Sequence, residues 1–338
     1  MKLFGKNFDR EVAIIAEVGV NHEGDVEAAS ELIRLAAEAG ADAVKFQSYT
    51  STRYASASDP ARLERVGRFC LDEAAHRRLA AEAKALGIHM FSTPVSEDVL
   101  PLLTELFPAI KIASGDLTFE PLIRAAARSG KPAILSTGLG TVEEIDAAVA
   151  WFADELDGTD IAERLVVMHC VSAYPTPIEE ANVLAVPFLA ARYSVPVGYS
   201  NHVIGPDACL AAIALGADVI EVHFTDRKSG REFRDHELSF DPDDLSHFVA
   251  QALRIRASLG RRDKMVTHSE AGNREAIRKG LIAAENLAVG TVLGPEHVMY
   301  ARPATEFAAL EINAVLGRRL KTTLSRGELI PRDGIEDA

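Results

Sequence analysis

Residues 195–224, VPVGYSNHVIGPDACLAAIALGADVIEVHF, set the pattern that decides the fold. The stretch begins with a short apolar run, Val195–Ser200, continues with helical periodicity to Gly216, and closes with a second apolar run, Val219–Phe224. A short run rich in β-formers followed by an amphipathic segment is the sequence form of a βα unit. Runs that are apolar throughout are typical of parallel strands covered by helices on both faces.

Eight such runs precede residue 225. Working outward, the other six are Val12–Glu17, Ala43–Gln47, Ile88–Thr93, Ala109–Ala113, Ala133–Thr137 and Leu165–Cys170. Eight successive βα units predict an α/β protein built as a (β/α)₈ TIM barrel over residues 1–260. A doubly wound open sheet is the rival architecture.

The pattern changes after the barrel. Residues 261–279 are polar and predict a linker, and residues 280–338 contain short apolar runs broken at glycines. Two segments of this region, AVGTVLGPEHV and SRGELIPRDGI, share a glycine turn, two apolar residues, a proline and a closing apolar residue. We therefore predict a small β-rich domain with approximate internal twofold symmetry. Because a domain of this size is only marginally stable alone, we expect it to dock on another surface.

Composition excludes several classes of partner. The 338 residues carry 36 Lys and Arg against 50 Asp and Glu, a formal net charge of −14, which disfavours nucleic acids and anionic membranes. No apolar run is long enough to span a bilayer, and the start has no signal-peptide pattern, so we expect a cytoplasmic protein. The three cysteines are far apart and indicate neither a disulfide framework nor a thiolate zinc site.

Polar residues stand where the eight strands end. They are Glu17, Lys45, Gln47, Thr93, Lys111, Ser114, Ser136, His169, Ser172, Ser200, His202, Glu221 and His223. The active sites of TIM barrels lie at the C-terminal ends of the strands, so these side chains are expected to meet at one rim.

Two histidines follow neighbouring strands of the predicted barrel. His202 and His223 would stand side by side on the rim and could share one divalent cation. Imidazoles without thiolates suit Mn²⁺, Mg²⁺, Co²⁺ or Zn²⁺, with water and substrate oxygens completing the coordination. The alternative is that each histidine only makes a structural hydrogen bond.

Two lysines, Lys45 and Lys111, lie within apolar strands. An ammonium group is costly to bury unless it meets an anion, so the pair indicates a phosphate or carboxylate ligand. The alternative is a pair of structural ion pairs with Glu17 and Asp116.

The tract GREFRDHELSF, residues 230–240, follows the last predicted strand as a loop. Its Asp235 and His236 could face the site or lie in solvent.

The ordered motifs AEVGVNHEG, VKFQSY, FSTP, KIASGDLTFEPLI, GKPAILSTGLGT, HCVSAYPTP, VGYSNH and EVHFTD resemble those of the sialic acid synthase family. The C-terminal region is similar to the antifreeze-like (SAF) domain of that family. The resemblance implies condensation of phosphoenolpyruvate with the open-chain aldehyde of an N-acetylated hexosamine, which releases phosphate and gives a nine-carbon 2-keto acid. N-acetylmannosamine is the expected acceptor, and a 2,4-diacetamido-6-deoxyhexose, which gives a legionaminic- or pseudaminic-type acid, is the alternative.

The resemblance also implies roles for individual residues. A divalent ion, Mn²⁺ first and Mg²⁺ or Co²⁺ as alternatives, is expected on His202 and His223, which makes both catalytic. Phosphoenolpyruvate is expected on Lys45, Thr93, Lys111, Ser114, Ser136 and Ser200. Proton transfer is assigned to Glu17 and Asp116. The sugar is expected to contact Gln47, Ser172, Tyr174 and Asp235, with Arg302 reaching it from the other subunit of a domain-swapped homodimer.

This chain departs from the family pattern in three places. Ser172 stands where neuraminate synthases have Asn, Asp116 stands where many relatives have Glu, and PATEF follows Arg302 in place of the common Pro-Gly-x-Gly. Two other functions are alternatives. Phosphoenolpyruvate aldol synthases that act on phosphorylated aldoses share the barrel but lack the SAF tail, and an ice- or carbohydrate-binding protein would not need the rim lysines and histidines.

Overall fold

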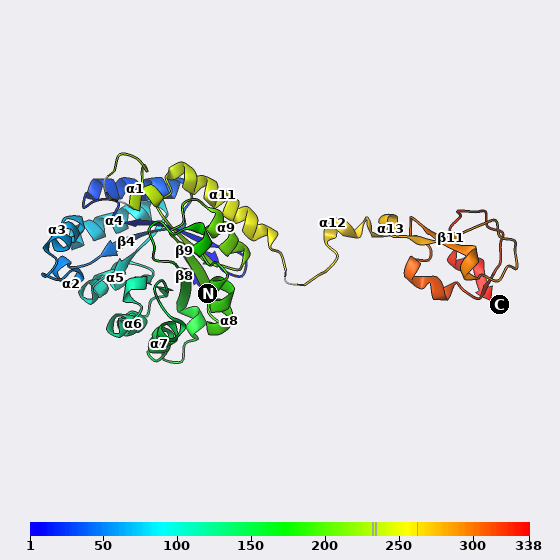
Figure 1. Cartoon of the computed structure of the whole chain (residues 1–338), viewed down its shortest axis with the longest axis horizontal. Helices are drawn as coiled ribbons and strands as arrows, with labels where there is room; N and C mark the ends of the chain where they lie inside the picture. The colour runs from blue at the N-terminus through cyan, green and yellow to red at the C-terminus, as the bar shows by residue number, and fades with distance from the viewer. Residues whose placement is uncertain (232, 234, 262) are drawn as a thin grey trace. The chain divides into compact units, whose positions relative to one another are not determined.

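The computed structural model describes residues 1–231, 233, 235–261 and 263–338. The chain forms two compact units, Met1–Gly260 and Arg261–Ala338, each with its own hydrophobic core. Figure 1 traces both along the chain. Each unit is described separately below.

The first unit is a closed barrel of eight parallel strands. They are β3 (Ala13–Gly19), β4 (Ala43–Ser48), β5 (His89–Pro94), β6 (Ile110–Ile112), β7 (Ala133–Ser136), β8 (Leu165–Cys170), β9 (Val197–Asn201) and β10 (Val219–His223). The barrel closes where β10 pairs with β3, in a register that sets His223 beside Glu17. The predicted barrel is therefore confirmed, and the open sheet is excluded.

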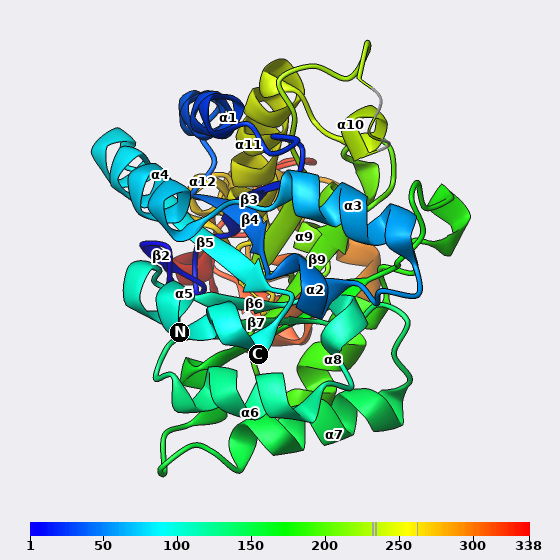
Figure 2. The same cartoon turned by 90° about the vertical axis from the view of Figure 1, so that its left-hand side faces the viewer.

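Helices surround the strands, as Figure 2 shows. They are α1 (Val26–Glu38), α4 (Glu73–Leu86), α5 (Leu100–Leu106), α6 (Glu120–Arg128), α7 (Val142–Ala153), α8 (Ala185–Tyr193), α9 (Asp207–Ala214) and α11 (Pro242–Ser258). Their starts follow from local chemistry: at α7, the Thr141 hydroxyl accepts a hydrogen bond from the Glu144 amide while the Glu144 carboxylate accepts one from the Thr141 amide. Asp241 and Asp244 form the same capping box at α11. Every residue of β3 is buried, as expected for a strand between barrel interior and helices.

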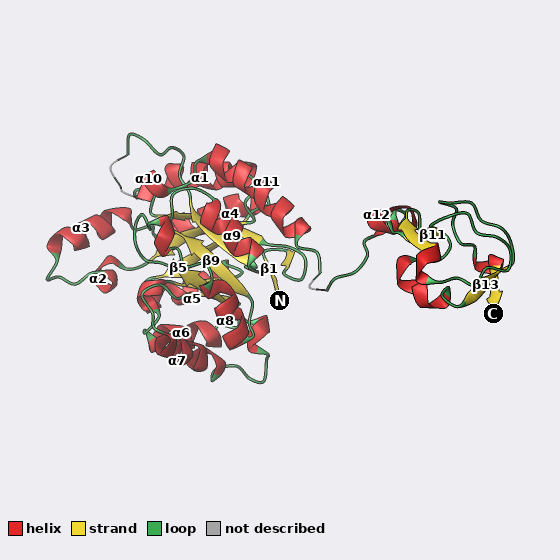
Figure 3. Ribbon diagram, turned by 45° about the vertical axis from the view of Figure 1, so that its right-hand side comes forward, coloured by secondary structure: helices red, strands yellow, loops and turns green. Residues whose placement is uncertain are grey.

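Additional segments cover the two ends of the barrel. At the N-terminal end lies a hairpin of β1 (Lys2–Leu3) and β2 (Lys6–Asn7). At the opposite end lie α2 (Ser51–Tyr54) and α3 (Pro60–Phe69), which follow β4, and α10 (Asp235–Leu238), which follows β10 (Figure 3). A small second core, formed by Val20, Tyr49, Ala55, Val66 and Phe69, packs against Phe233 and so joins the loop after β4 to the loop after β10.

The second unit is built from short elements. They are α12 (His268–Ala271), α13 (Arg274–Ile277), β11 (Gly280–Ala283), β12 (Val298–Ala301), β13 (Arg318–Leu320) and β14 (Ile335–Asp337). β11 pairs antiparallel with β12, and β13 pairs antiparallel with β14. A 3₁₀ turn precedes both β12 and β14, at Pro295–His297 and Arg332–Gly334. The two similar sequence segments of this region therefore form similar structures. None of the helices in the described part of the chain is long and apolar enough to span a bilayer.

Candidate active site

Four charged side chains meet at the C-terminal end of the barrel. Lys45 Nζ lies 2.8 Å from Glu17 Oε2 and 3.7 Å from Glu221 Oε1. Lys111 Nζ lies 2.9 and 3.0 Å from the two carboxylate oxygens of Glu221. No side chain of the four is more than 5% exposed. Removing four charges from water is costly, and this alternation of opposite charges offsets part of that cost.

The partner of Lys111 differs from the one considered from the sequence. Ion pairs with Glu17 and Asp116 were the structural alternative, and the first is present. Lys111, however, pairs with Glu221 on β10. Glu221 was noted as a polar strand end but was not among the predicted site residues. Its spacing from His223 could have identified Glu221 as a site residue, because residues two apart on one strand point to the same side of it.

The surroundings shift the pKa values of the two carboxylates, Glu17 and Glu221, in opposite directions. Burial favours the neutral form of Glu221, but the charges of Lys111 and Lys45 outweigh burial and lower its pKa to about 2. Burial raises the pKa of Glu17, and the charge of Glu221 adds to this against the attraction of Lys45. Burial also lowers the pKa of Lys111. Glu17 is therefore the carboxylate of this pair better suited to take up and release a proton.

Hydroxyl and amide groups from neighbouring strands border the cluster. Lys45 donates to Thr93 at 3.2 Å, Ser200 donates to Glu221 at 3.0 Å, and the Gln47 amide lies 3.5 Å from Glu17 Oε1. Ser136 at the end of β7 is buried, and its hydroxyl has no hydrogen-bond partner among the residues that the structure describes. An unpartnered buried hydroxyl at this rim is a place where a ligand oxygen would be accommodated.

Two serines converge on Gly138 in the loop after β7. Ser114 Oγ accepts a hydrogen bond from the Gly138 amide at 3.0 Å. A Cβ atom at position 138 would lie 2.4 Å from Ser172 Oγ and 2.8 Å from Ser114 Oγ, so a side chain there would require both serine hydroxyls to move. The same region borders a cavity of about 540 Å³ whose lining includes Cys170, Ser172 and Asn182, but neither lysine of the cluster.

The two predicted metal ligands lie together. The rings of His202 and His223 have centroids 5.2 Å apart, and the Tyr174 ring lies 4.0 Å from that of His202. His202 Nδ1 is 2.6 Å from the Val171 carbonyl oxygen. A carbonyl only accepts, so Nδ1 carries the proton and Nε2 keeps its lone pair. Burial lowers the pKa of His223 well below its usual range, which keeps this imidazole neutral.

These features fit a divalent ion held by two imidazoles. Burial disfavours a charge on His202, but the hydrogen bond and charge of Cys170, 3.8 Å from Nδ1, outweigh burial and raise the His202 pKa, so an ion would compete with a proton there. Among the described residues, no group of three or more His, Cys, Asp or Glu side chains is arranged to hold an ion. The remaining coordination positions would therefore be taken by oxygens from water or substrate.

Three other predicted site residues differ in their surroundings. Asp116 lies in a 3₁₀ turn after β6, and burial raises its pKa to about 6. Asp235 is the first residue of α10. Burial raises the pKa of Tyr174, and the charge of Asp235 is among those that raise it further. Arg302 belongs to the second unit, where its Nε donates to the Ile277 carbonyl, so its predicted contact with a sugar stays a prediction.

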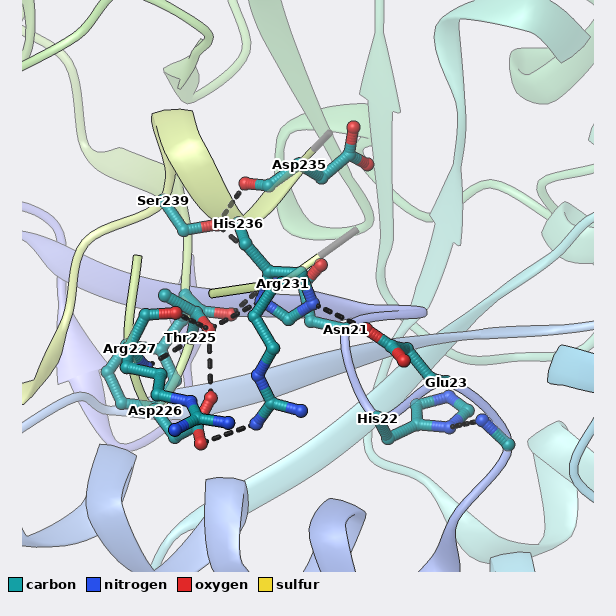
Figure 4. Close-up of polar contacts among 12 residues, drawn as sticks. Asn21, His22, Glu23, Thr225, Asp226, Arg227, Arg231, Asp235, His236 and Ser239 are labelled. Atoms are coloured by element: carbon teal, nitrogen blue, oxygen red, sulfur yellow. Dashed lines mark hydrogen bonds and ion pairs between the residues drawn. The ribbon is translucent and has the colours of Figure 1, made fainter. Parts of the chain in front are cut away.

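His236 neither faces the rim with Asp235 nor lies in solvent, the two alternatives considered from the sequence. Its side chain is buried, with Nδ1 2.7 Å from Thr225 Oγ1 and Nε2 3.1 Å from Glu23 Oε1 (Figure 4). No local pattern in the sequence indicates this contact, because Glu23 and His236 are brought together only when the barrel closes.

Comparisons with known proteins cover nearly the whole chain. The sequence profile of the NeuB family matches residues 32–264, and that of the SAF domain matches residues 278–336. An N,N'-diacetyllegionaminic acid synthase of Campylobacter jejuni is 34% identical over 95% of this chain and 99% of its own. A pseudaminic acid synthase of Campylobacter jejuni is 31% identical over 98% of both chains. The crystal structure of a sialic acid synthetase from Leptospira borgpetersenii, in complex with citrate, superposes with a TM-score of 0.73 at 34% identity, over 78% of this chain and 90% of its own.

The raised pKa of Asp116 predicts a pH-dependent effect of Asp116→Asn on stability. With a folded pKa of about 6 against an ordinary value of 3.8, the folded state loses stability as the pH rises from about 4 to 6 and the carboxyl ionises. The amide avoids this cost, so the variant should gain about 1–2 kcal/mol in free energy of unfolding at pH 8, and little at pH 4. Urea unfolding at the two pH values measures this. Asp157→Asn, at an exposed carboxylate, is the control; equal effects of the two substitutions at pH 8 would contradict the prediction.

Proposed function

Since the chain belongs to the NeuB family and ends in a SAF domain, we propose that it condenses phosphoenolpyruvate with the open-chain aldehyde of an N-acetylated hexosamine. It is a carbon–carbon bond-forming transferase of the sialic acid synthase type. The observation that carries the proposal is the buried cluster of Lys45, Lys111, Glu17 and Glu221 beside the His202–His223 pair. It combines cationic groups for an anionic substrate with a carboxylate whose pKa is raised.

The two lysines would hold the phosphoenolpyruvate anion. Lys45 is paired with Glu17, whose pKa is raised by burial, so protonation of Glu17 frees the Lys45 ammonium group to bind a carboxylate or phosphate. The other expected contacts border these lysines or continue the same rim: Thr93, Ser114, Ser136 and Ser200. Lys111 stays beside the ionised Glu221, which fixes the position of its ammonium group.

The reaction then needs proton transfers at two places. C3 of phosphoenolpyruvate forms a bond to the aldehyde carbon, and the aldehyde oxygen takes up a proton. Water adds to the cationic C2 and loses a proton, which leaves a C2 hydroxyl. Cleavage of the bond between C2 and the phosphate oxygen then releases phosphate, which takes up the proton of this hydroxyl, and leaves the keto group. Glu17, with its raised pKa, and Asp116, with a pKa of about 6, are the carboxyl groups suited to these transfers near neutral pH.

His202 and His223 would hold the divalent ion, with Mn²⁺ the first expectation and Mg²⁺ or Co²⁺ as alternatives. When bound, such an ion supplies Lewis-acid polarisation of the acceptor aldehyde. The support on this chain is the Nδ1–H of His202 held by the Val171 carbonyl, which aims the Nε2 lone pair away from the backbone. Gln47, Ser172, Tyr174 and Asp235 are proposed to contact the sugar.

Two acceptors have comparable support. N-acetylmannosamine is favoured by the likeness to the Leptospira borgpetersenii sialic acid synthetase, and a 2,4-diacetamido-6-deoxyhexose by the likeness to the Campylobacter jejuni diacetyllegionaminic and pseudaminic acid synthases. Ser172, in place of the Asn of neuraminate synthases, is one of the residues proposed to contact the acceptor.

Phosphate release tests the function directly. Phosphoenolpyruvate with Mn²⁺ should release phosphate only when a suitable sugar is added, and the acceptors to compare are N-acetylmannosamine and a 2,4-diacetamido-6-deoxyhexose. Mass spectrometry of the product should show the nine-carbon keto acid. Lack of turnover with both sugars, by protein that is folded and contains metal, would refute the proposal.

Removal of either imidazole tests the metal site. His202→Ala and His223→Ala should each lower both Mn²⁺ affinity and the rate of phosphate release by about 100-fold or more, with little change in thermal stability. Mn²⁺ affinity is measured by electron paramagnetic resonance of free Mn²⁺. His76→Ala, which removes a buried imidazole bonded to Ser48, is the matched control and should keep Mn²⁺ affinity. Full activity of a His202 or His223 variant in EDTA would disprove the metal role.

Truncation tests the proposed swapped homodimer. A chain of residues 1–260 keeps the entire first core and should fold. It should be monomeric by light scattering and have an acceptor KM raised about tenfold or more, because the contact from Arg302 of the other subunit is lost. Arg302→Ala in the full chain should raise the acceptor KM while keeping the dimer. A monomeric truncated protein with an unchanged acceptor KM would exclude the arrangement.

A further inference from the structure

The loop between β10 and α11 begins and ends at one point of the barrel rim. The Thr225 amide donates to the Phe240 carbonyl at 3.0 Å, and the Phe240 amide donates to the His223 carbonyl at 2.7 Å. The described residues between these positions include Asp235, the proposed sugar contact. Because the loop is attached to the strand that carries His223, its position relative to the site depends on what fixes its far part.

His236 fixes that far part. It is 1% exposed and bridges Thr225, 2.7 Å from Nδ1, and Glu23, 3.1 Å from Nε2. A carboxylate only accepts, so Nε2 carries a proton toward Glu23, and the neutral ring then accepts at Nδ1 from the Thr225 hydroxyl. The contact joins the loop after the last barrel strand, β10, to the loop after the first, β3.

A second link fixes the neighbouring residue. The Asn21 amide donates to the Phe224 carbonyl at 2.8 Å and to Ser239 Oγ at 3.2 Å, and the Ser239 hydroxyl donates to the Asp235 carbonyl at 2.5 Å. The backbone of Asp235 is therefore held while its side chain is directed elsewhere. Figure 4 shows the Asp235 carboxylate pointing away from the His236 ring.

The backbone of Glu23 is strained, and its side chain contacts His236 in this strained conformation. Glu23 has φ 51°, in the left-handed region that costs a non-glycine residue about 1 kcal/mol or more. Its carboxylate is about one-third exposed and would be well hydrated without His236.

We propose that His236 is a positioning residue for acceptor binding: through its bridge between Thr225 and Glu23, it holds the neighbouring Asp235 in place in the loop after β10. This rests on the proposed function. The Asp235 carboxylate would accept hydrogen bonds from hydroxyl or amide groups of the acceptor sugar. The bridge should therefore affect acceptor binding, whereas phosphoenolpyruvate binding depends on the lysine cluster.

His236→Phe is the main test. Phenylalanine keeps a ring beside Phe233 and loses both hydrogen bonds, while Thr225 has Asp226 and the Arg227 carbonyl as other acceptors and Glu23 can be hydrated. We expect the acceptor KM to rise about 5- to 30-fold and the phosphoenolpyruvate KM to stay within about twofold. The effect of Asp235→Asn on the acceptor KM should shrink in the His236→Phe background, since the two residues act together.

Lys228→Gln is the matched control, because it breaks an exposed ion pair between the same loop and Asp244 without touching the bridge. It should leave both KM values unchanged. An unchanged acceptor KM in His236→Phe, equal increases for both substrates, or the same increase in Lys228→Gln would overturn the proposal.

Hydrogen exchange without substrate separates this proposal from the proposed function. The His236 and Ser239 amides are hydrogen-bonded within the loop, to the Phe233 and His236 carbonyls. In His236→Phe their exchange should be about 5- to 30-fold faster, and that of the β9 amides unchanged. Unchanged exchange at positions 236 and 239 would overturn the bridge even if the enzyme turns over. Faster exchange in a protein that accepts neither sugar would instead contradict the proposed function alone.

Discussion

The site depends on the burial of four charges at the C-terminal end of the barrel. Lys45 and Lys111 are tolerable there only because Glu17 and Glu221 lie within hydrogen-bonding distance, and each carboxylate is likewise tolerable only beside a lysine. The four residues come from β3, β4, β6 and β10. A shift of one strand by one residue would turn its charged side chain away from its partners. The charges therefore favour a single register of these strands. The barrel brings the four side chains together, and their ion pairs in turn stabilise that register of the barrel.

Closure of the barrel sets the rest of the geometry. β10 pairs with β3 so that His223 lies beside Glu17. A proposed metal ligand and a proposed proton carrier thus become neighbours, although they lie near opposite ends of the sequence of the first unit. The same closure places Glu23 beside His236 and Asn21 beside Ser239. Side-chain hydrogen bonds therefore join the loops after the first and the last strand of the barrel (Figure 4), and residues with proposed roles lie on both of these strands.

Much of this arrangement could be predicted from the sequence, and the remainder has identifiable physical reasons. The eight strands were found to within two residues of their bounds because parallel strands are apolar throughout and the helices between them are amphipathic. Glu221 was seen at a strand end, but its pairing with Lys111 depends on which strands face each other across the barrel interior, and local spacing does not contain that information. His236 was left between the site and solvent because its partner Glu23 is more than two hundred positions away. The raised pKa of Asp116 likewise results from burial, which appears only in the folded chain.

The close approach of Ser172 and Ser114 to Gly138 couples three positions of the chain that lie far apart in sequence. A side chain at position 138 would displace the hydroxyls of Ser172 and Ser114, which lie where its Cβ atom would come. A substitution at position 138 would therefore also change the direction of the Ser172 side chain. Positions 138 and 172 are thus coupled, so the effect of a substitution at one of them depends on the residue at the other.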